Sequence, residues 1–143
     1  MTVSLHKISY AEHLLSIHGI GPVTLSTILG EIGDITQYRR AEEIIKLAGL
    51  NLYEISSGKH RGRRRISKRG RPLLRKTLFF ASLRMVKRKG VFRQDYLRLT
   101  EGNKMQKTKA LIALSRKLLR VIFALFRDNV SYGSTKAESA LAA

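Results

Sequence analysis

The sequence predicts an all-α fold, a compact bundle of about five to six helices. Apolar residues recur at helical spacing in four long segments, and glycine or proline stands at most of their ends. Stretches that alternate between apolar and polar residues, which would indicate strands, are short and few. With 143 residues and 43% hydrophobic composition the chain can bury one core. We therefore expect one domain over residues 1–132 and a disordered tail over 133–143.

The N-terminal third of the chain is predicted to form three helices. The first begins with a capping box at residues 9–12 and ends at Gly19. The second opens with a Gly-Pro pair at Gly21, has apolar residues at positions i, i+3, i+4 and i+7, and is closed by Gly33. The third is expected over about residues 36–48, where the next glycine ends it.

The rest of the chain is predicted to form a helical bundle over about residues 72–128, preceded by a loop. Residues 50–71 have no clear period, so they indicate a loop, with a short hairpin as an open alternative. A fourth helix runs from Pro72 toward Gly90, and a short one follows around 92–99. The last helix, over about 105–127, has the widest apolar face, which is typical of the central helix of a bundle.

Positive charge is concentrated in one part of the chain. The formal net charge is +18, and residues 55–94 hold fifteen of the 28 Lys and Arg residues without a single acidic residue. The centre of this stretch is a Gly/Arg-rich loop between the third and fourth long helices. A local positive field without counter-charge indicates a polyanionic partner, of which nucleic-acid phosphates are the commonest. Charge alone also fits a ribosomal or a membrane-surface protein.

Several classes of site and location are excluded by composition. Because the chain has no cysteine, disulfides and thiolate metal sites are excluded. The four histidines do not combine with carboxylates at a metal-binding spacing, so no metal site is expected in this chain. The N-terminus lacks the charged and then apolar run of a signal peptide, and no apolar run is long enough to cross a membrane. A cytoplasmic protein is expected.

The first candidate binding motif is a Gly-x-Gly turn between two short helices, over about residues 9–33. Its glycines would let a phosphate approach the bare amides at the start of the second helix, where the helix dipole is positive. This pattern is typical of a helix-hairpin-helix, a module that binds the DNA backbone. The candidate contacts are Gly19, Ile20, Gly21 and Thr24. In the alternative interpretation the glycines only make a tight turn, and Ile20 is buried in either case.

The second candidate motif is the basic loop over about residues 50–71, together with the first turn of the following helix. Arginine can bind phosphate through two parallel hydrogen bonds, as lysine cannot. The candidate DNA contacts are Lys59, Arg61, Arg63, Arg64, Arg65, Lys68, Arg69, Arg71 and Arg75. Glycines 58, 62 and 70 are expected to keep the backbone pliant and close to the ligand. The alternative is a disordered basic loop that binds any nucleic acid.

Two further features bear on chemistry. Ser57 stands beside the arginine cluster, where a serine could attack a phosphodiester and form a phosphoserine while the arginines stabilise the developing charge. From the residues alone, a serine before a glycine is more often a turn residue. On the last helix, four cations recur on one face, as a solvated stripe or as a second phosphate contact: Lys109, Arg116, Arg120 and Arg127.

Seven short motifs follow one another along the chain: Gly19-Ile20-Gly21-Pro22, Glu31-Ile32-Gly33-Asp34-Ile35, Ala48-Gly49-Leu50, Ser57-Gly58-Lys59, Arg65-Ile66-Ser67-Lys68-Arg69-Gly70, Leu74-Arg75, and Ala113-Leu114-Ser115-Arg116-Lys117-Leu118-Leu119-Arg120. In this order they resemble the C-terminal transposase domain of DEDD-type insertion-sequence transposases, the group related to the pilin-gene invertase. The resemblance covers about residues 10–128. It implies a DNA recombinase that moves a mobile element, with Ser57 as the nucleophile and Ser56 as the alternative.

The resemblance also implies parts that this sequence does not contain. Full-length family members carry an N-terminal RuvC-like domain with four metal-binding carboxylates, joined by a coiled coil, and nothing here matches it. We expect Mg²⁺ in that N-terminal domain and no cofactor in this chain. This chain would then be a fragment that has no recombinase activity alone. The expected partner is DNA, with a homo-oligomer in the full-length protein. Some members use a guide RNA, and the sequence does not decide whether this one does.

Two alternatives to a recombinase remain at this point. One is a non-catalytic helix-hairpin-helix module that binds nucleic acid, in which neither serine matters. The other is a ribosomal-type RNA-binding protein, which would prefer folded RNA over duplex DNA. The order of the seven motifs favours the recombinase over both.

Overall fold

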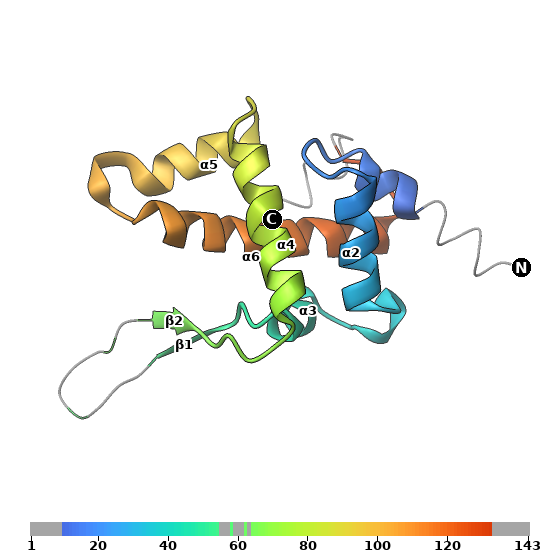
Figure 1. The fold of residues 1–143 in the computed structure, drawn as a ribbon, viewed down its shortest axis with the longest axis horizontal. Helices are drawn as coiled ribbons and strands as arrows, with labels where there is room; N and C mark the ends of the chain where they lie inside the picture. The colour runs from blue at the N-terminus through green and yellow to red at the C-terminus, as the bar shows by residue number, and fades with distance from the viewer. Residues whose placement is uncertain (1–9, 55–57, 59–61, 63, 133–143) are drawn as a thin grey trace, which may run out of the picture.

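A computed structural model describes residues 10–54, 58, 62 and 64–132, and shows a mostly helical chain with one small sheet (Figure 1). Residues 10–15 are helical. The elements that follow are α2 (Pro22–Ile32), η1 (Ile35–Gln37), α3 (Ala41–Leu47), β1 (Leu52–Glu54), β2 (Arg64–Ile66), α4 (Pro72–Val86), α5 (Val91–Thr100), η2 (Glu101–Asn103) and α6 (Lys107–Asp128). The predicted helical body is confirmed, and the two-stranded sheet departs from an all-α fold. Ser9 of the predicted capping box and the predicted tail, 133–143, lie outside the described residues.

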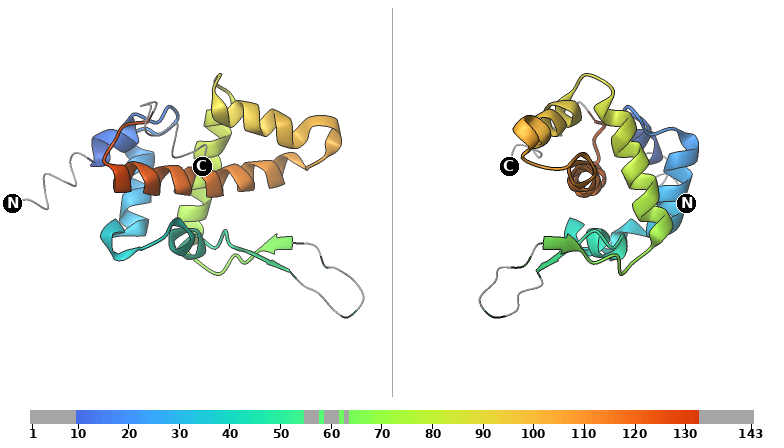
Figure 2. Two further views of the ribbon diagram at one scale, coloured as in Figure 1. Left: turned by 180° about the vertical axis from the view of Figure 1, so that it is seen from behind. Right: turned by 60° about the vertical axis from the view of Figure 1, so that its left-hand side comes forward.

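The longest helix, α6, is the centre of the body, as its wide apolar face predicts. It packs against α3, α4 and α5, and its buried side chains include Leu118, Leu119 and Ile122. Figures 1 and 2 show α4 crossing α6 while α5 runs beside it and α2 lies against α4. Within the part of the chain that the structure describes, no helix is long and apolar enough to cross a membrane.

The second predicted helix is confirmed, whereas the third begins later than predicted. Helix α2 starts at Pro22 and its C-cap, Gly33, has a φ of 73°. Helix α3 begins at Ala41 and not near Thr36, because a separate 3₁₀ turn precedes it. The Asp34 side chain accepts a hydrogen bond from the Thr36 amide at 3.0 Å and so caps that turn. Tyr38 then adopts an extended backbone, which separates the two elements.

The predicted loop over residues 50–71 contains a hairpin, the alternative that the sequence left open. Strands β1 and β2 are antiparallel, with Leu52 opposite Ile66, Tyr53 opposite Arg65 and Glu54 opposite Arg64. Residues directly opposite each other share a face of the sheet. Ile66 packs against the core, so Tyr53 and Arg65 lie on the other face. The strands extend away from the helical body in Figures 1 and 2.

The chain that leaves β2 passes very close to the end of α3. A Cβ atom at Gly70 would lie 2.3 Å from the Leu47 carbonyl oxygen and 2.5 Å from the Gly49 amide nitrogen. The Arg71 amide donates to the same Leu47 oxygen at 2.8 Å. Gly70 was expected to keep the backbone pliant near a ligand. The structure instead gives it a packing role, because only glycine fits at this crossing.

Candidate nucleic-acid interface

Most cations of the hairpin and of the segment after it are exposed. Arg64 and Arg65 are exposed on β2, as are Lys68, Arg69 and Arg71 in the connection to α4. Among the described residues, the only ion pair recorded for these five cations joins Arg71 to Glu31, at 3.5 Å. The other four form no ion pair with a described acid, although Glu54 stands opposite Arg64 across the two strands. An anionic ligand is the natural counter-charge for such a surface.

One face of the hairpin forms a hollow of about 310 Å³ against α3, and the residues that line it all carry polar groups. Tyr53 and Arg69 line it from the hairpin side, and Lys46 lines it from the last turn of α3. The Ser67 hydroxyl, also in the lining, donates to the Asn51 side-chain oxygen at 2.6 Å, which holds the strand ends together. Two cations beside hydroxyl groups are suited to phosphate. Lys46 was missed by the sequence prediction, since it stands outside the basic stretch.

Arg75 has a different environment from the other predicted contacts. It is half-buried in the first turns of α4, and its Nη1 donates to the Ala48 carbonyl oxygen at 3.2 Å. A Cβ atom at Gly49 would lie 2.6 Å from that same nitrogen, so the glycine makes room for the guanidinium. Arg75 thus ties α4 to the end of α3, and its contact with a phosphate stays a prediction.

The Gly-x-Gly turn packs against the C-terminal half of α4. Ile20 is buried, which confirms that part of the prediction. Gly19 has a φ of 105°, a conformation that favours glycine. From α4, the Arg84 side chain donates to the Gly19 carbonyl oxygen at 3.1 Å and to the Thr24 hydroxyl at 3.0 Å. The sequence did not identify Arg84, because nothing in its spacing marks a partner some 60 residues away.

The start of α2 is open to solvent beside that guanidinium. Gly21 is the N-cap residue, and no side chain caps the helix. Gly21 and Val23 are exposed, and Thr24 is half-buried. Uncapped amides at a helix N-terminus attract anions, and a nearby guanidinium adds to this effect.

The cations of α6 do not form a uniformly solvated stripe. Arg120 lies 3.7 Å from Glu42, and Arg127 pairs with Asp128 at 3.1 Å. Arg116 is half-buried, and its Nη1 has no partner among the described residues. Burial, followed by the charge of Arg120, lowers the pKa of Arg116.

Five of the predicted site residues lie outside the described residues: Ser56, Ser57, Lys59, Arg61 and Arg63. Between them Gly58 is exposed, with a φ of 60°. Within the described ranges, no three acidic or histidine side chains come together as a metal site. Three of the described acids, Glu31, Glu42 and Asp95, are instead paired with cations.

Residues 11–97 match the family model described as the transposase IS116/IS110/IS902 family. The chain belongs to this family. It is 33% identical over 125 residues to the transposase for insertion sequence element IS1111A of Coxiella burnetii, covering 85% of this chain and 34% of that protein. It is 30% identical over 120 residues to the pilin gene-inverting protein of Moraxella bovis, covering 83% of this chain and 37% of that protein.

These similarities confirm the resemblance at the level of the family and of the pilin gene-inverting proteins. An IS116 protein of Streptomyces clavuligerus is also similar, 30% identical over 118 residues, which are 82% of this chain and 29% of that protein. The chain spans about a third of the length of the curated relatives it matches.

Proposed function

We propose that this chain is the DNA-binding and strand-exchange segment of a transposase that moves an insertion sequence. One observation supports this more than any other: in a member of a transposase family, the hairpin carries exposed cations that no described acid pairs. Duplex DNA is the polyanion on which a transposase acts. Arg64, Arg65 and Arg69 are the proposed phosphate contacts on the described part of the hairpin and after it.

The proposed nucleophile is Ser57, with Ser56 as the alternative. In the proposed step the Ser57 oxygen forms a bond to the scissile phosphorus as the bond from phosphorus to a deoxyribose oxygen breaks. The proton that the serine hydroxyl loses is gained by the departing sugar oxygen. The phosphoserine keeps the energy of the broken ester for rejoining, and neighbouring arginines stabilise the charge on the phosphate.

The Gly-x-Gly turn is the proposed second DNA contact, as a helix-hairpin-helix. The uncapped amides of α2 and the Arg84 guanidinium beside them support this proposal. A phosphate there would carry no sequence information, so the turn would position the duplex without reading it.

Other components of the reaction are proposed from the resemblance alone. They are a DEDD-type RuvC-like domain that holds Mg²⁺, a homo-oligomer that pairs two DNA sites, and a guide RNA as a further partner in some family members. The proposed place of action is the cytoplasm, on DNA.

A salt-titrated binding assay with duplex DNA tests the hairpin. Arg64→Ala combined with Arg65→Ala should reduce the slope of log affinity against log salt by about 2, since each lost phosphate contact lowers it by about 0.9. Arg39→Ala combined with Arg40→Ala is the matched control, because it removes two adjacent exposed arginines before α3 and should leave the slope unchanged. Equal effects of the two pairs would contradict the assignment of phosphates to the hairpin.

A recombination assay tests the serine, in a recombination-competent protein that contains this segment. Ser57→Ala should abolish strand exchange and leave DNA binding intact, while Ser56→Ala should retain both. The reverse result would move the nucleophile to Ser56. Full activity of both variants would support a non-catalytic binding module instead.

A further inference from the structure

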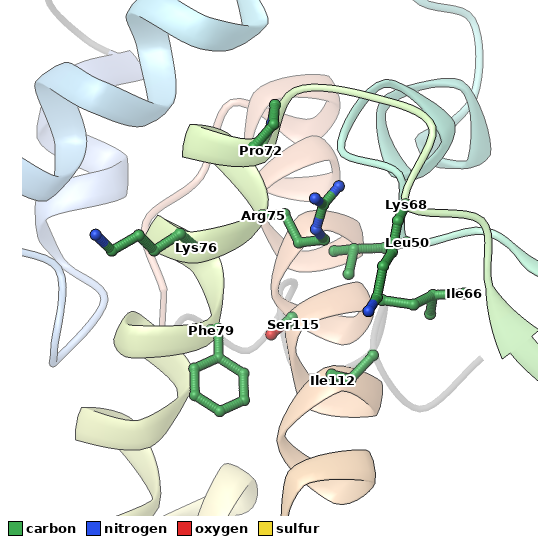
Figure 3. A pocket seen from close by; sticks show the side chains of 9 residues that line it. All are labelled: Leu50, Ile66, Lys68, Pro72, Arg75, Lys76, Phe79, Ile112 and Ser115. Atoms are coloured by element: carbon green, nitrogen blue, oxygen red, sulfur yellow. The ribbon is translucent and has the colours of Figure 1, made fainter.

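A second cavity lies at the base of the hairpin, where the loop, α4 and α6 meet (Figure 3). Its volume is about 380 Å³, within the range of small-ligand sites. Leu50 and Ile66 line it from the hairpin side, Phe79 lines it from α4, and Ile112 and Ser115 line it from α6. Neither of the proposed DNA contacts, the arginines Arg64, Arg65 and Arg69 and the Gly-x-Gly turn, lines this space.

The interior of this cavity is apolar. Leu50 and Ser115 are fully buried, while Phe79, Ile66 and Ile112 are half-buried and so present part of their surface to the opening. The Ser115 hydroxyl donates to the Leu111 carbonyl oxygen at 2.8 Å, so its hydrogen is already used within α6. The cavity therefore suits an apolar group, and the Phe79 ring offers a surface on which a flat one can stack.

The rim of the cavity is cationic. Lys68 is exposed there, and Arg75 is held at the edge by its bond to Ala48. Lys76 also lines the cavity, but its amino group points away from the other lining side chains (Figure 3). None of the described residues that line the cavity is acidic. Lys68 has a φ of 52°, a conformation that is uncommon for lysine and is maintained by the bond from its amide to the Gly49 oxygen at 2.9 Å. An occupant that matches both parts has an apolar body and a negatively charged attachment.

We propose that this cavity receives an unstacked base of a nucleic-acid strand, with phosphates of that strand at Lys68 and Arg75. The proposal rests on the proposed function, since it requires that the chain binds nucleic acid. A base stacked on an aromatic ring, beside a backbone held by cations, is a recurrent mode of single-strand binding. Lys68 follows the last residue of β2 by two positions, so one strand could contact both the rim and the cations of β2. An apolar protein side chain would fit the interior and leave these two cations unmatched.

Binding of two single strands with equal numbers of phosphates tests this proposal. The probes are a strand of about 12 thymidines and the same backbone with abasic residues at every position, measured by fluorescence anisotropy. The chain should bind the thymidine strand at least about fivefold more tightly, which corresponds to stacking of one base. Both strands should show the same salt slope, because they carry the same charge.

Two neighbouring phenylalanines provide the matched variants. Phe79→Leu removes the stacking ring and should abolish the preference for the thymidine strand. Phe80→Leu should keep it, because Phe80 is exposed, does not line the cavity, and lies edge-on to Phe79 with 5.7 Å between ring centroids. A preference that persists in Phe79→Leu would overturn the assignment to this cavity.

The comparison of the two strands decides the question even if Phe79→Leu fails to fold. Equal affinity of the unmodified chain for both strands would overturn the base site and leave the proposed function standing. Failure to bind either strand or duplex DNA would overturn the proposed function itself.

Discussion

Replacing Gly70 with alanine tests the crossing that joins the hairpin to α3. The added Cβ would lie 2.3 Å from the Leu47 oxygen and 2.5 Å from the Gly49 nitrogen. Both are backbone atoms, so no side-chain rotation can relieve the overlap. The two segments must separate, which stretches the 2.8 Å hydrogen bond from the Arg71 amide to the Leu47 oxygen.

The expected loss of stability at Gly70 combines two effects. Loss of a hydrogen bond costs about 1 kcal/mol, and overpacking costs about 1–3 kcal/mol. Gly70→Ala should therefore lower the free energy of unfolding by about 2–4 kcal/mol. For a domain of this size that corresponds to a fall in Tm of about 6–16 °C, measured by circular dichroism.

The same substitution at Gly30 is the matched control and should have the opposite sign. Gly30 lies in α2, and no atom comes within 4 Å of a Cβ built there. Alanine is favoured over glycine in a helix by about 1 kcal/mol, so Gly30→Ala should raise the Tm by a few degrees. An unchanged Tm in Gly70→Ala would refute the close crossing, since nothing would then have to move.

Two further predictions concern α4. Arg84→Met should lower the free energy of unfolding by about 1 kcal/mol, because its hydrogen bonds to the Gly-x-Gly turn are lost. If a phosphate binds beside Arg84, the substitution should also reduce the salt slope of duplex-DNA binding by about 1. An unchanged slope would contradict a phosphate contact at this turn. The buried Ser82 hydroxyl has Ser115 as its recorded partner, at 3.4 Å, whereas Ser115 also bonds to Leu111. Ser115→Ala should cost about 1–3 kcal/mol in urea unfolding and Ser82→Ala much less, while equal costs would argue against this asymmetry.

The helices could be predicted wherever local signals define their ends. Pro22 and Gly33 bound α2 through conformations that their own backbones prefer, and the apolar face of α6 is wide enough to mark it as central. The start of α3 could not be predicted, because it depends on the hydrogen bond between Asp34 and Thr36 and on the extended backbone of Tyr38. This hydrogen bond is itself local, but it marks the start of a single 3₁₀ turn as readily as the start of a longer helix, so the sequence did not reveal where α3 begins.

The hairpin was only an open alternative because its strands carry almost no apolar pattern. Strand β2 is Arg64-Arg65-Ile66, in which only Ile66 packs on the core. The position of β2 is set by backbone hydrogen bonds to distant residues: the Ser67 amide donates to the Asn51 carbonyl oxygen, and the Lys68 amide donates to the Gly49 carbonyl oxygen. The charge pattern of the sequence predicted the cations of the candidate site, but it did not predict that they lie beside Lys46 of α3.

The glycines of two of the seven motifs, Gly49 and Gly70, meet at the crossing between α3 and the hairpin. These two glycines therefore serve the backbone packing that holds the hairpin to the helical body. Substitutions of the cations in the loop and substitutions of its glycines should then impair different properties of the protein. Removing Arg64 and Arg65 should weaken affinity for phosphates, whereas disturbing Gly70 should change where the anchored strands present the segment that contains Ser57. If Ser57 is the nucleophile, glycine variants that still fold should lose strand exchange before they lose DNA binding.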